Sequence, residues 1–181
     1  MRAPMTQALA SLVPLEQVPP AAVEDLLDRV FGPDRQQRTA YLIRDDTDWL
    51  PALSFALVED ELRLIGSIQV WPVALTDQDG KRHPLLMVGP VAVLPEEQDK
   101  GNGVALMIAF ARALEAAGPA DHRHPPQMLI GDPEYYGRFG FSAEHTGGWR
   151  APGPFEARRL LARADEPANL PREGMLGPWR G

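Results

Sequence analysis

The segment Leu85–Leu94, with the residues that follow it, constrains the fold of this chain more than any other feature. The segment is a nearly continuous apolar run, which is typical of a central strand buried on both faces. A short polar loop with glycines at Gly101 and Gly103 comes next. Apolar residues then recur at helical spacing over Gly103–Ala117. A buried strand that leads through a glycine loop into a helix predicts an α/β domain with a β-loop-α unit at its centre.

The rest of the chain predicts a mixed sheet flanked by helices. We expect helices over Val18–Phe31 and Arg35–Arg44, and one or two helical turns over Pro133–Arg138. The expected strands are Ala8–Val13, Leu53–Val58, Leu62–Val73, Gln127–Ile130, and a hairpin of Phe139–His145 with Arg158–Arg163. We therefore predict one domain over 1–165, with a Pro/Gly-rich segment, 166–181, packed on or near it.

Composition excludes several kinds of protein. A formal net charge of −7 argues against nucleic acid as a partner and weakly favours neutral or cationic substrates. The absence of cysteine excludes a thiolate nucleophile and a cysteine-based zinc site, and the four histidines form no helical pair at ligand spacing, so we expect no metal. No apolar run approaches the ~20 residues that span a bilayer. We therefore expect a cytoplasmic protein without a membrane partner.

The glycine loop has the features of an anion site. Gly101 and Gly103 permit a sharp turn and a close approach by a ligand, and the free N–H groups at the start of the helix favour a phosphate. Lys100 could add a positive charge. On spacing alone, a loop without a ligand is an equal alternative, because one Gly-x-Gly is weak evidence. The string fits neither a Walker loop nor a dinucleotide fingerprint, because Leu106 stands where the latter needs a small residue.

Two ordered motifs resemble those of a known family. The string Val93-x4-Gln98-x-x-Gly101-x-Gly103 resembles the Gln/Arg-x-x-Gly-x-Gly/Ala motif of the GNAT superfamily of N-acetyltransferases. Downstream, Gly-Asp-Pro-x-Tyr-Tyr-Gly-Arg-Phe-Gly-Phe over Gly131–Phe141 looks like that superfamily's second signature, and especially like that of one bacterial, largely uncharacterised subgroup. One departure is Asn102, which stands where such proteins usually carry a branched apolar residue, and which could loosen the loop.

The resemblance implies a GNAT-like fold with a splayed central strand pair and acetyl-CoA as cosubstrate. The backbone of Val91, Ala92 and Val93 would pair with the pantetheine arm. The pyrophosphate would be held by the loop residues Gln98, Asp99, Lys100, Gly101, Asn102, Gly103 and Val104. The dipeptide Gly89-Pro90 inside the central strand fits a bulge that frees a backbone N–H for the thioester carbonyl, although a proline can also simply end pairing at a sheet edge.

The resemblance also assigns catalytic roles. Tyr136 matches the superfamily's tyrosine, which would protonate the leaving thiolate, whereas the neighbouring Tyr135 would point away and serve in packing. The base is open: Asp132 and Glu134 are candidates, as is a water chain, and Asp132 could equally cap a short helix. We expect Trp71 and Trp149 either to line the acceptor pocket or to pack in the core.

The predicted activity is that of an N-acetyltransferase, which moves an acetyl group from acetyl-CoA to a primary amine of a small molecule or a protein. The alternative is a module that binds acyl-CoA as a sensor without efficient turnover. A regulatory protein that uses the C-terminal segment as a contact arm is a third hypothesis, and an acyl donor longer than acetyl is also open. Because homodimers are common in the superfamily, a second copy of the chain is a candidate partner.

Overall fold

The computed structural model describes residues 9–60, 63–118 and 124–180, and its centre is a mixed eight-stranded sheet. Six strands lie in the order β1 (Ser11–Pro14), β2 (Phe55–Glu59), β3 (Arg63–Thr76), β4 (Arg82–Val93), β5 (Gln127–Ile130) and β7 (Leu160–Arg163). Strand β8 (Glu173–Pro178) pairs with β3 and with the short β6 (Gly148–Arg150). The predicted α/β class with a mixed central sheet is confirmed.

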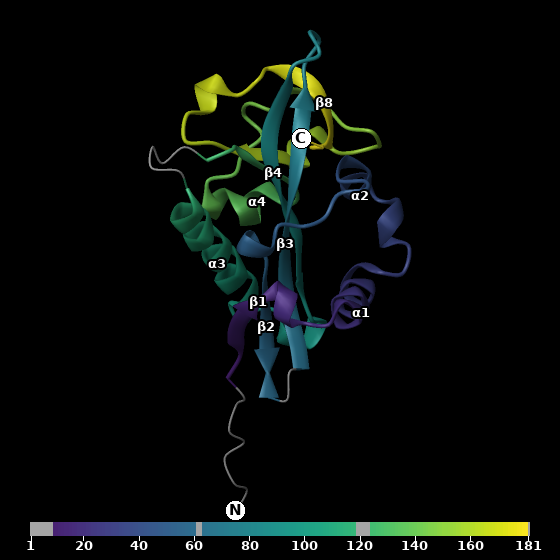
Figure 1. Cartoon of the computed structure of the whole chain (residues 1–181), viewed down its shortest axis with the longest axis vertical. Helices are drawn as coiled ribbons and strands as arrows, with labels where there is room; N and C mark the ends of the chain where they lie inside the picture. The colour runs from purple at the N-terminus through teal and green to yellow at the C-terminus, as the bar shows by residue number, and fades with distance from the viewer. Residues whose placement is uncertain (1–8, 61–62, 119–123, 181) are drawn as a thin grey trace, which may run out of the picture.

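Helices cover both faces of the sheet. Figure 1 shows α1 (Pro20–Phe31) and α2 (Thr39–Ile43) on one side, and α3 (Asn102–Ala117) and α4 (Pro133–Tyr136) on the other. Pro20 opens α1, where its missing N–H costs no hydrogen bond, and Gly32, with a φ of 93°, ends the helix. The apolar stripe of α3 is buried against the sheet, as its spacing predicted.

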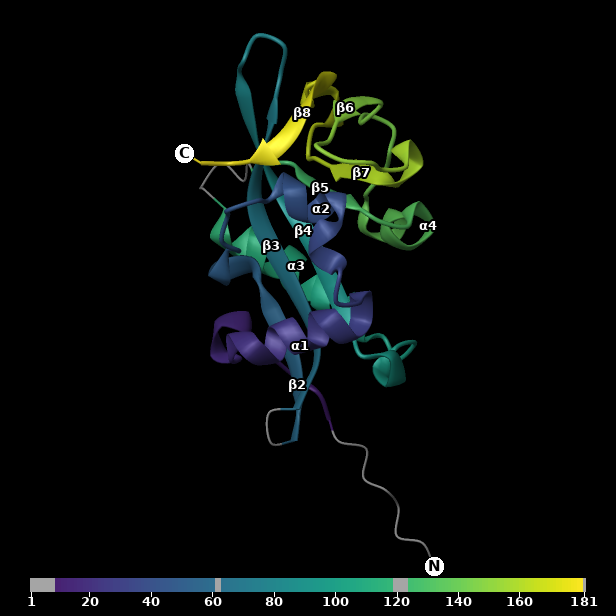
Figure 2. The same cartoon turned by 90° about the vertical axis from the view of Figure 1, so that its right-hand side faces the viewer.

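The apolar residues form two separate cores. The larger core joins α1 and α3 to β1, β2 and the first half of β3, and it contains Phe110, which is fully buried. The smaller core joins the second half of β3 to β7 and β8, and it contains Trp149 and Leu176. Figure 2 shows β6, β7 and β8 gathered beside that second half. The long strand β3 therefore connects the two cores.

The C-terminal end of the chain departs from one expectation, the hairpin, and adds a strand to the sheet. The predicted hairpin of 139–145 with 158–163 is wrong: only one bridge, between Ser142 and Ala162, joins these segments, and β7 pairs with β5 instead. The segment 166–181 contributes β8 to the sheet, antiparallel to β3 and parallel to β6. The reason is burial, because Leu176 is 1% exposed and completes the smaller core.

The central strands β4 and β5 splay apart, as expected. Their parallel pairing covers Leu86 with Gln127 and Met87 with Met128, after which the two strands separate. The register of pairing shifts on the other edge of β4, which faces β3. There Gln69 of β3 stands opposite both Gly89 and Pro90. This is a β-bulge, so the bulge expected at Gly89-Pro90 is confirmed.

Candidate functional site

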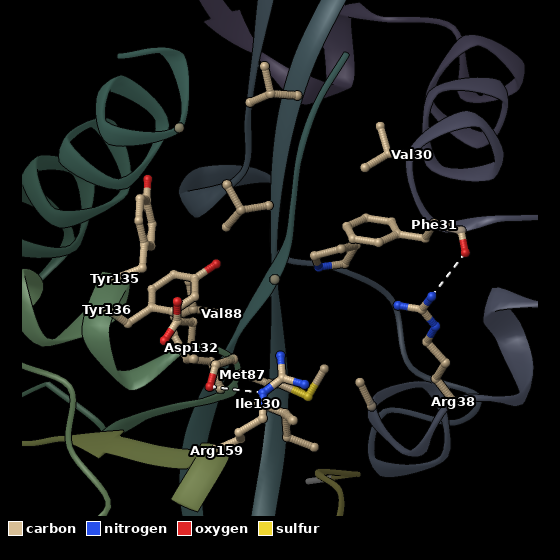
Figure 3. A pocket seen from close by; sticks show the side chains of 18 of the residues that line it. Val30, Phe31, Arg38, Met87, Val88, Ile130, Asp132, Tyr135, Tyr136 and Arg159 are labelled. Atoms are coloured by element: carbon tan, nitrogen blue, oxygen red, sulfur yellow. Dashed lines mark hydrogen bonds between the residues drawn. The ribbon is translucent and has the colours of Figure 1, made fainter. Parts of the chain in front are cut away.

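A cavity of about 1230 Å³ opens where β4 and β5 separate. Its lining comes from both faces of the sheet: α1 and α2 on one side, and the glycine loop and α4 on the other. Figure 3 shows Tyr135 and Tyr136 on the α3 side, Phe31 and Arg38 on the α1–α2 side, and Val88 and Met87 between them. The cavity has space for an extended ligand that reaches from the loop to the α1–α2 wall.

The glycine loop presents unpaired amide groups to this cavity. The hydrogen-bond ladder of α3 begins where Ala105 N–H donates to Gly101 O at 3.0 Å, so the N–H groups of Asn102, Gly103 and Val104 have no acceptor within this helix. Gly101 has a φ of 82°, which favours glycine. The N–H groups and the helix dipole together make a site for a phosphate, and this local structure fits the pyrophosphate of CoA.

Side chains of the loop fix its shape. Asn102 Nδ2 donates to Glu97 O at 2.9 Å, and Gln98 Nε2 donates to Val93 O at 3.1 Å. Asn102 was expected to loosen the loop, whereas its side chain ties the two ends of the loop together. The unusual residue at this position therefore replaces an apolar contact with a hydrogen bond.

The structure distributes the expected cofactor residues unevenly. Most of them line the cavity: Val91, Val93, Gln98, Asp99, Gly101, Asn102, Gly103 and Val104. Ala92 is fully buried in the larger core, and Lys100 is not part of the cavity wall. The ammonium of Lys100 lies 3.2 Å from Glu97 Oε2, so its charge is balanced by that carboxylate.

The two tyrosines of α4 both reach the cavity. Their rings meet edge to face, with centroids 4.9 Å apart. Burial raises the pKa of Tyr136 to about 12, so its phenol is protonated at neutral pH and can give up a proton. Tyr135 was expected to pack, and its ring does lie against those of Tyr136 and Phe139, but it also lines the cavity. A Cβ built on Gly103 would lie 2.8 Å from its hydroxyl oxygen. Gly103 therefore makes room for Tyr135 at the start of α3.

Asp132 stands at the cavity in a structural role. Its Oδ1 accepts a hydrogen bond from Glu134 N–H at 3.0 Å, which makes it the N-cap of α4. Asp132, a candidate for the base, therefore has a capping contact, and a water chain stays an equal candidate for the base.

Trp149 is 2% exposed in the smaller core and donates from Nε1 to Pro171 O, so it packs in the core and forms no wall of the cavity.

Sequence reasoning missed a cluster on the α1–α2 side. The guanidinium of Arg44 lies between two aromatic rings, 4.0 Å from the centroid of Tyr41 and 3.9 Å from that of Trp71. Arg44 Nη1 and Trp71 Nε1 both donate to Gly89 O, at 3.3 and 2.8 Å. The cluster thus holds the bulge of β4 from the α2 side. The three-residue spacing of Tyr41 and Arg44 was visible in the sequence, but their joint contact with Gly89 was not.

Two kinds of site do not occur in the part of the chain that the structure describes. Among residues 9–60, 63–118 and 124–180, no three His, Asp or Glu side chains gather as metal ligands. The helices of these same segments are all too short or too polar to cross a membrane. One of the four histidines, His122, lies outside the described residues.

Comparisons with known proteins agree with this geometry. No protein-family model matches the chain. The curated protein "Uncharacterized N-acetyltransferase YhbS" of Escherichia coli K12 is 27% identical over 149 residues, which are 81% of this chain and 83% of that protein.

Two solved structures share the fold. The crystal structure of YhbS from E. coli in complex with CoA superposes with a TM-score of 0.68 at 23% identity, covering 99% of this chain and 93% of that one. A GNAT family acetyltransferase from Brucella melitensis in complex with acetyl-CoA gives a TM-score of 0.57 at 22% identity, covering 92% and 94%.

Proposed function

We propose that this chain is an N-acetyltransferase of the GNAT superfamily, and that it transfers the acetyl group of acetyl-CoA to a primary amine of a small molecule or a protein; its similarity to YhbS and the shared fold support this. One observation carries the proposal. A single cavity joins the unpaired amides of α3, the bulged strand β4 and the protonated phenol of Tyr136. These are a phosphate site, an open strand edge and an acid, in the order in which an extended thioester would need them.

The residues that would hold acetyl-CoA follow from this order. The N–H groups of Asn102, Gly103 and Val104 would bind the pyrophosphate, and the edge of β4 at Val91 and Val93 would pair with the pantetheine arm. The backbone at the bulge would then face the thioester carbonyl and stabilise negative charge on its oxygen. All of these contacts use the backbone, so side chains would affect them only through the shape of the loop.

Tyr136 would act as the general acid. The amine nitrogen attacks the thioester carbon, a C–N bond forms and the C–S bond breaks. The Tyr136 hydroxyl gives its proton to the leaving sulfur, and the amine loses a proton to water or to Asp132. Burial raises the pKa of this phenol to about 12, whereas an unperturbed thiol has a pKa near ~8.5, so proton transfer to the free thiolate is uphill. The transfer would therefore accompany cleavage of the C–S bond, and the proton that the amine loses would return the phenolate to the phenol.

Thermal unfolding with acetyl-CoA is the first test. A ligand at 100 times its dissociation constant adds about 2.7 kcal/mol, which raises the melting temperature by several degrees. Acetyl-CoA and CoA should both stabilise the protein, whereas ATP at the same concentration should not. Absence of any shift at millimolar acetyl-CoA would refute the proposal.

Thiol release with a panel of amines then separates enzyme from sensor. Amine-dependent release of CoA supports transfer, whereas binding without release supports the sensor. Alternative acyl donors in the same assay give the acyl preference. The cytoplasmic location and the homodimer stay predictions.

A further inference from the structure

More positive than negative side chains around the cavity lack an oppositely charged partner. Its acidic residues are mostly engaged elsewhere: Glu97 pairs with Lys100 and Arg63, Glu156 pairs with Arg158, and Asp132 caps α4. By contrast, four of its five arginines form no ion pair with any carboxylate in the described part of the chain, namely Arg38, Arg44, Arg138 and Arg159. The cavity therefore has an excess of positive charge, although the whole chain is acidic.

Arg44 stands out from the other three because it is 5% exposed, whereas Arg38 and Arg138 are exposed and Arg159 is half-buried. Its burial lowers the pKa of the guanidinium to about 10, so it is still charged at neutral pH. Burying a charge without a counter-ion is costly, and two aromatic rings with one backbone carbonyl offset that cost only in part. An anion supplied by a ligand would complete the environment of Arg44.

The phosphates of CoA are poorly placed to be that anion. Arg44 contacts Gly89, and the strand from Gly89 to Val93 separates this contact from the glycine loop. At ~3.3 Å per residue this segment is ~13 Å long. Arg44 also contacts β4 from the α2 side, whereas the glycine loop leads into α3 on the opposite face. The anion at Arg44 therefore belongs to the second substrate.

We propose that the acceptor is a small amine that also carries a carboxylate, as an amino acid does, and that Arg44 binds this carboxylate. The inference rests on the proposed function, which it deepens by giving the class of acceptor. The other buried arginine of the cavity wall, Arg35, is already paired with Glu24 and Asp28. A monoanion therefore matches the single charge of Arg44, whereas a phosphate monoester with its second charge would need a further unpaired cation. The flat face of Arg44 is occupied by Tyr41 and Trp71, which leaves the edge of the guanidinium, with its N–H groups, for a planar carboxylate.

The test compares acceptors that differ only in the carboxylate. Amino acids, including glycine and β-alanine, are assayed with acetyl-CoA by thiol release beside their amides and their decarboxylated amines. Amidation lowers the basicity of the amine and decarboxylation does not, so a preference against both controls cannot come from the amine. We expect kcat/KM to fall by on the order of 10²-fold or more without the carboxylate. Phosphoethanolamine tests the phosphate alternative.

Arg44→Met connects that preference to the residue. We expect the variant to lose its preference for the carboxylate, with kcat/KM for the amino acid falling to the level of its amide. Its stabilisation by acetyl-CoA should be unchanged, and its melting temperature should not fall much, because an unpaired buried charge has been removed. Arg112→Met, which removes an exposed arginine of α3 outside the cavity, should retain the preference.

The outcomes separate the two proposals. If acetyl-CoA does not stabilise the protein, the proposed function fails. If acetyl-CoA binds, but amides, simple amines or phosphoethanolamine are the better acceptors, or no carboxylate-bearing amine is acetylated, the function can stand and the acceptor class is wrong. A preference for the carboxylate that survives in Arg44→Met would also overturn the assignment to this residue.

Discussion

The donor half of the cavity, formed by β4 and the glycine loop, and the acceptor half, formed by α1 and α2, balance their charges differently. In the donor half Lys100 and Glu97 neutralise each other, and unpaired backbone N–H groups face the ligand. In the acceptor half the side chain of Arg44 supplies the unpaired charge. A site made of backbone depends on the course of the loop, whereas a site made of one buried side chain depends on the identity of that residue. The proposed donor site therefore rests on the fold, and the proposed acceptor site rests on Arg44.

Tyr136 lies where the two halves meet, and its replacement should have the largest effect. Tyr136→Phe removes the proton donor and keeps the ring, so we expect kcat to fall by ~10²–10⁴-fold while stabilisation by acetyl-CoA is unchanged. Steady-state kinetics with the best acceptor measure this. Tyr135→Phe is the matched control, because it removes the neighbouring hydroxyl. An unchanged kcat in Tyr136→Phe would assign the acid to another group.

Gly103→Ala should harm the donor half alone. The new Cβ would lie 2.8 Å from the hydroxyl oxygen of Tyr135, so the half-buried ring or the start of α3 must shift. We expect KM for acetyl-CoA to rise roughly tenfold, equivalent to about 1.4 kcal/mol of binding free energy. The double variant Gly103→Ala/Tyr135→Phe should regain part of the affinity, because the clashing oxygen is gone. If the preference for a carboxylate changed in the single variant, the two halves would not be independent.

Asn102→Asp should have a smaller effect on the same half. Aspartate keeps the shape of the side chain but cannot donate to Glu97 O, and one such hydrogen bond contributes about 1 kcal/mol. We expect stabilisation by acetyl-CoA to fall and KM to rise roughly fivefold. Asn102→Leu restores the apolar residue that the superfamily usually has. If both variants bind as tightly as the parent, the side chain of Asn102 has no part in shaping the loop.

The smallest effect is expected from alkaline pH. Burial raises the pKa of Tyr136 to about 12, so the protonated, active form of this acid persists below that value and is lost only above it. Deprotonation of the amine acts in the opposite direction and can only raise the rate. We therefore expect no fall in kcat/KM up to about pH 9. Above that pH the guanidinium of Arg44, whose pKa is lowered to about 10, loses its charge, and kcat/KM falls for acceptors that carry a carboxylate. A fall in kcat/KM centred near pH 9 would mean that a group other than Tyr136 acts as the acid.

Local patterns predicted the donor half well, and the acceptor half poorly. The strand, glycine loop and helix from Leu85 to Ala117 follow from hydrophobic spacing, and the bulge at Gly89 follows from the proline after it. The cluster of Arg44 joins residues far apart in the chain, 45 positions in the case of Gly89, and no local pattern contains such a contact. The same reason explains the missed strand β8, whose partner Val73 lies early in the chain.

The course of β3 has a consequence for how the chain folds. The strand is shared by the two cores. Its second half, Val73–Thr76, pairs with the nearby β4 along one edge, but its other edge finds a partner only in residues 175–178. Contacts so distant in sequence form late, because closing a long loop has an entropic cost. We expect the larger core to form first and the smaller core to wait until synthesis has passed Pro178. Pulsed hydrogen exchange during refolding should therefore show the amides of Ile65 and Ile68 in β3 protected before those of Met175 and Leu176 in β8.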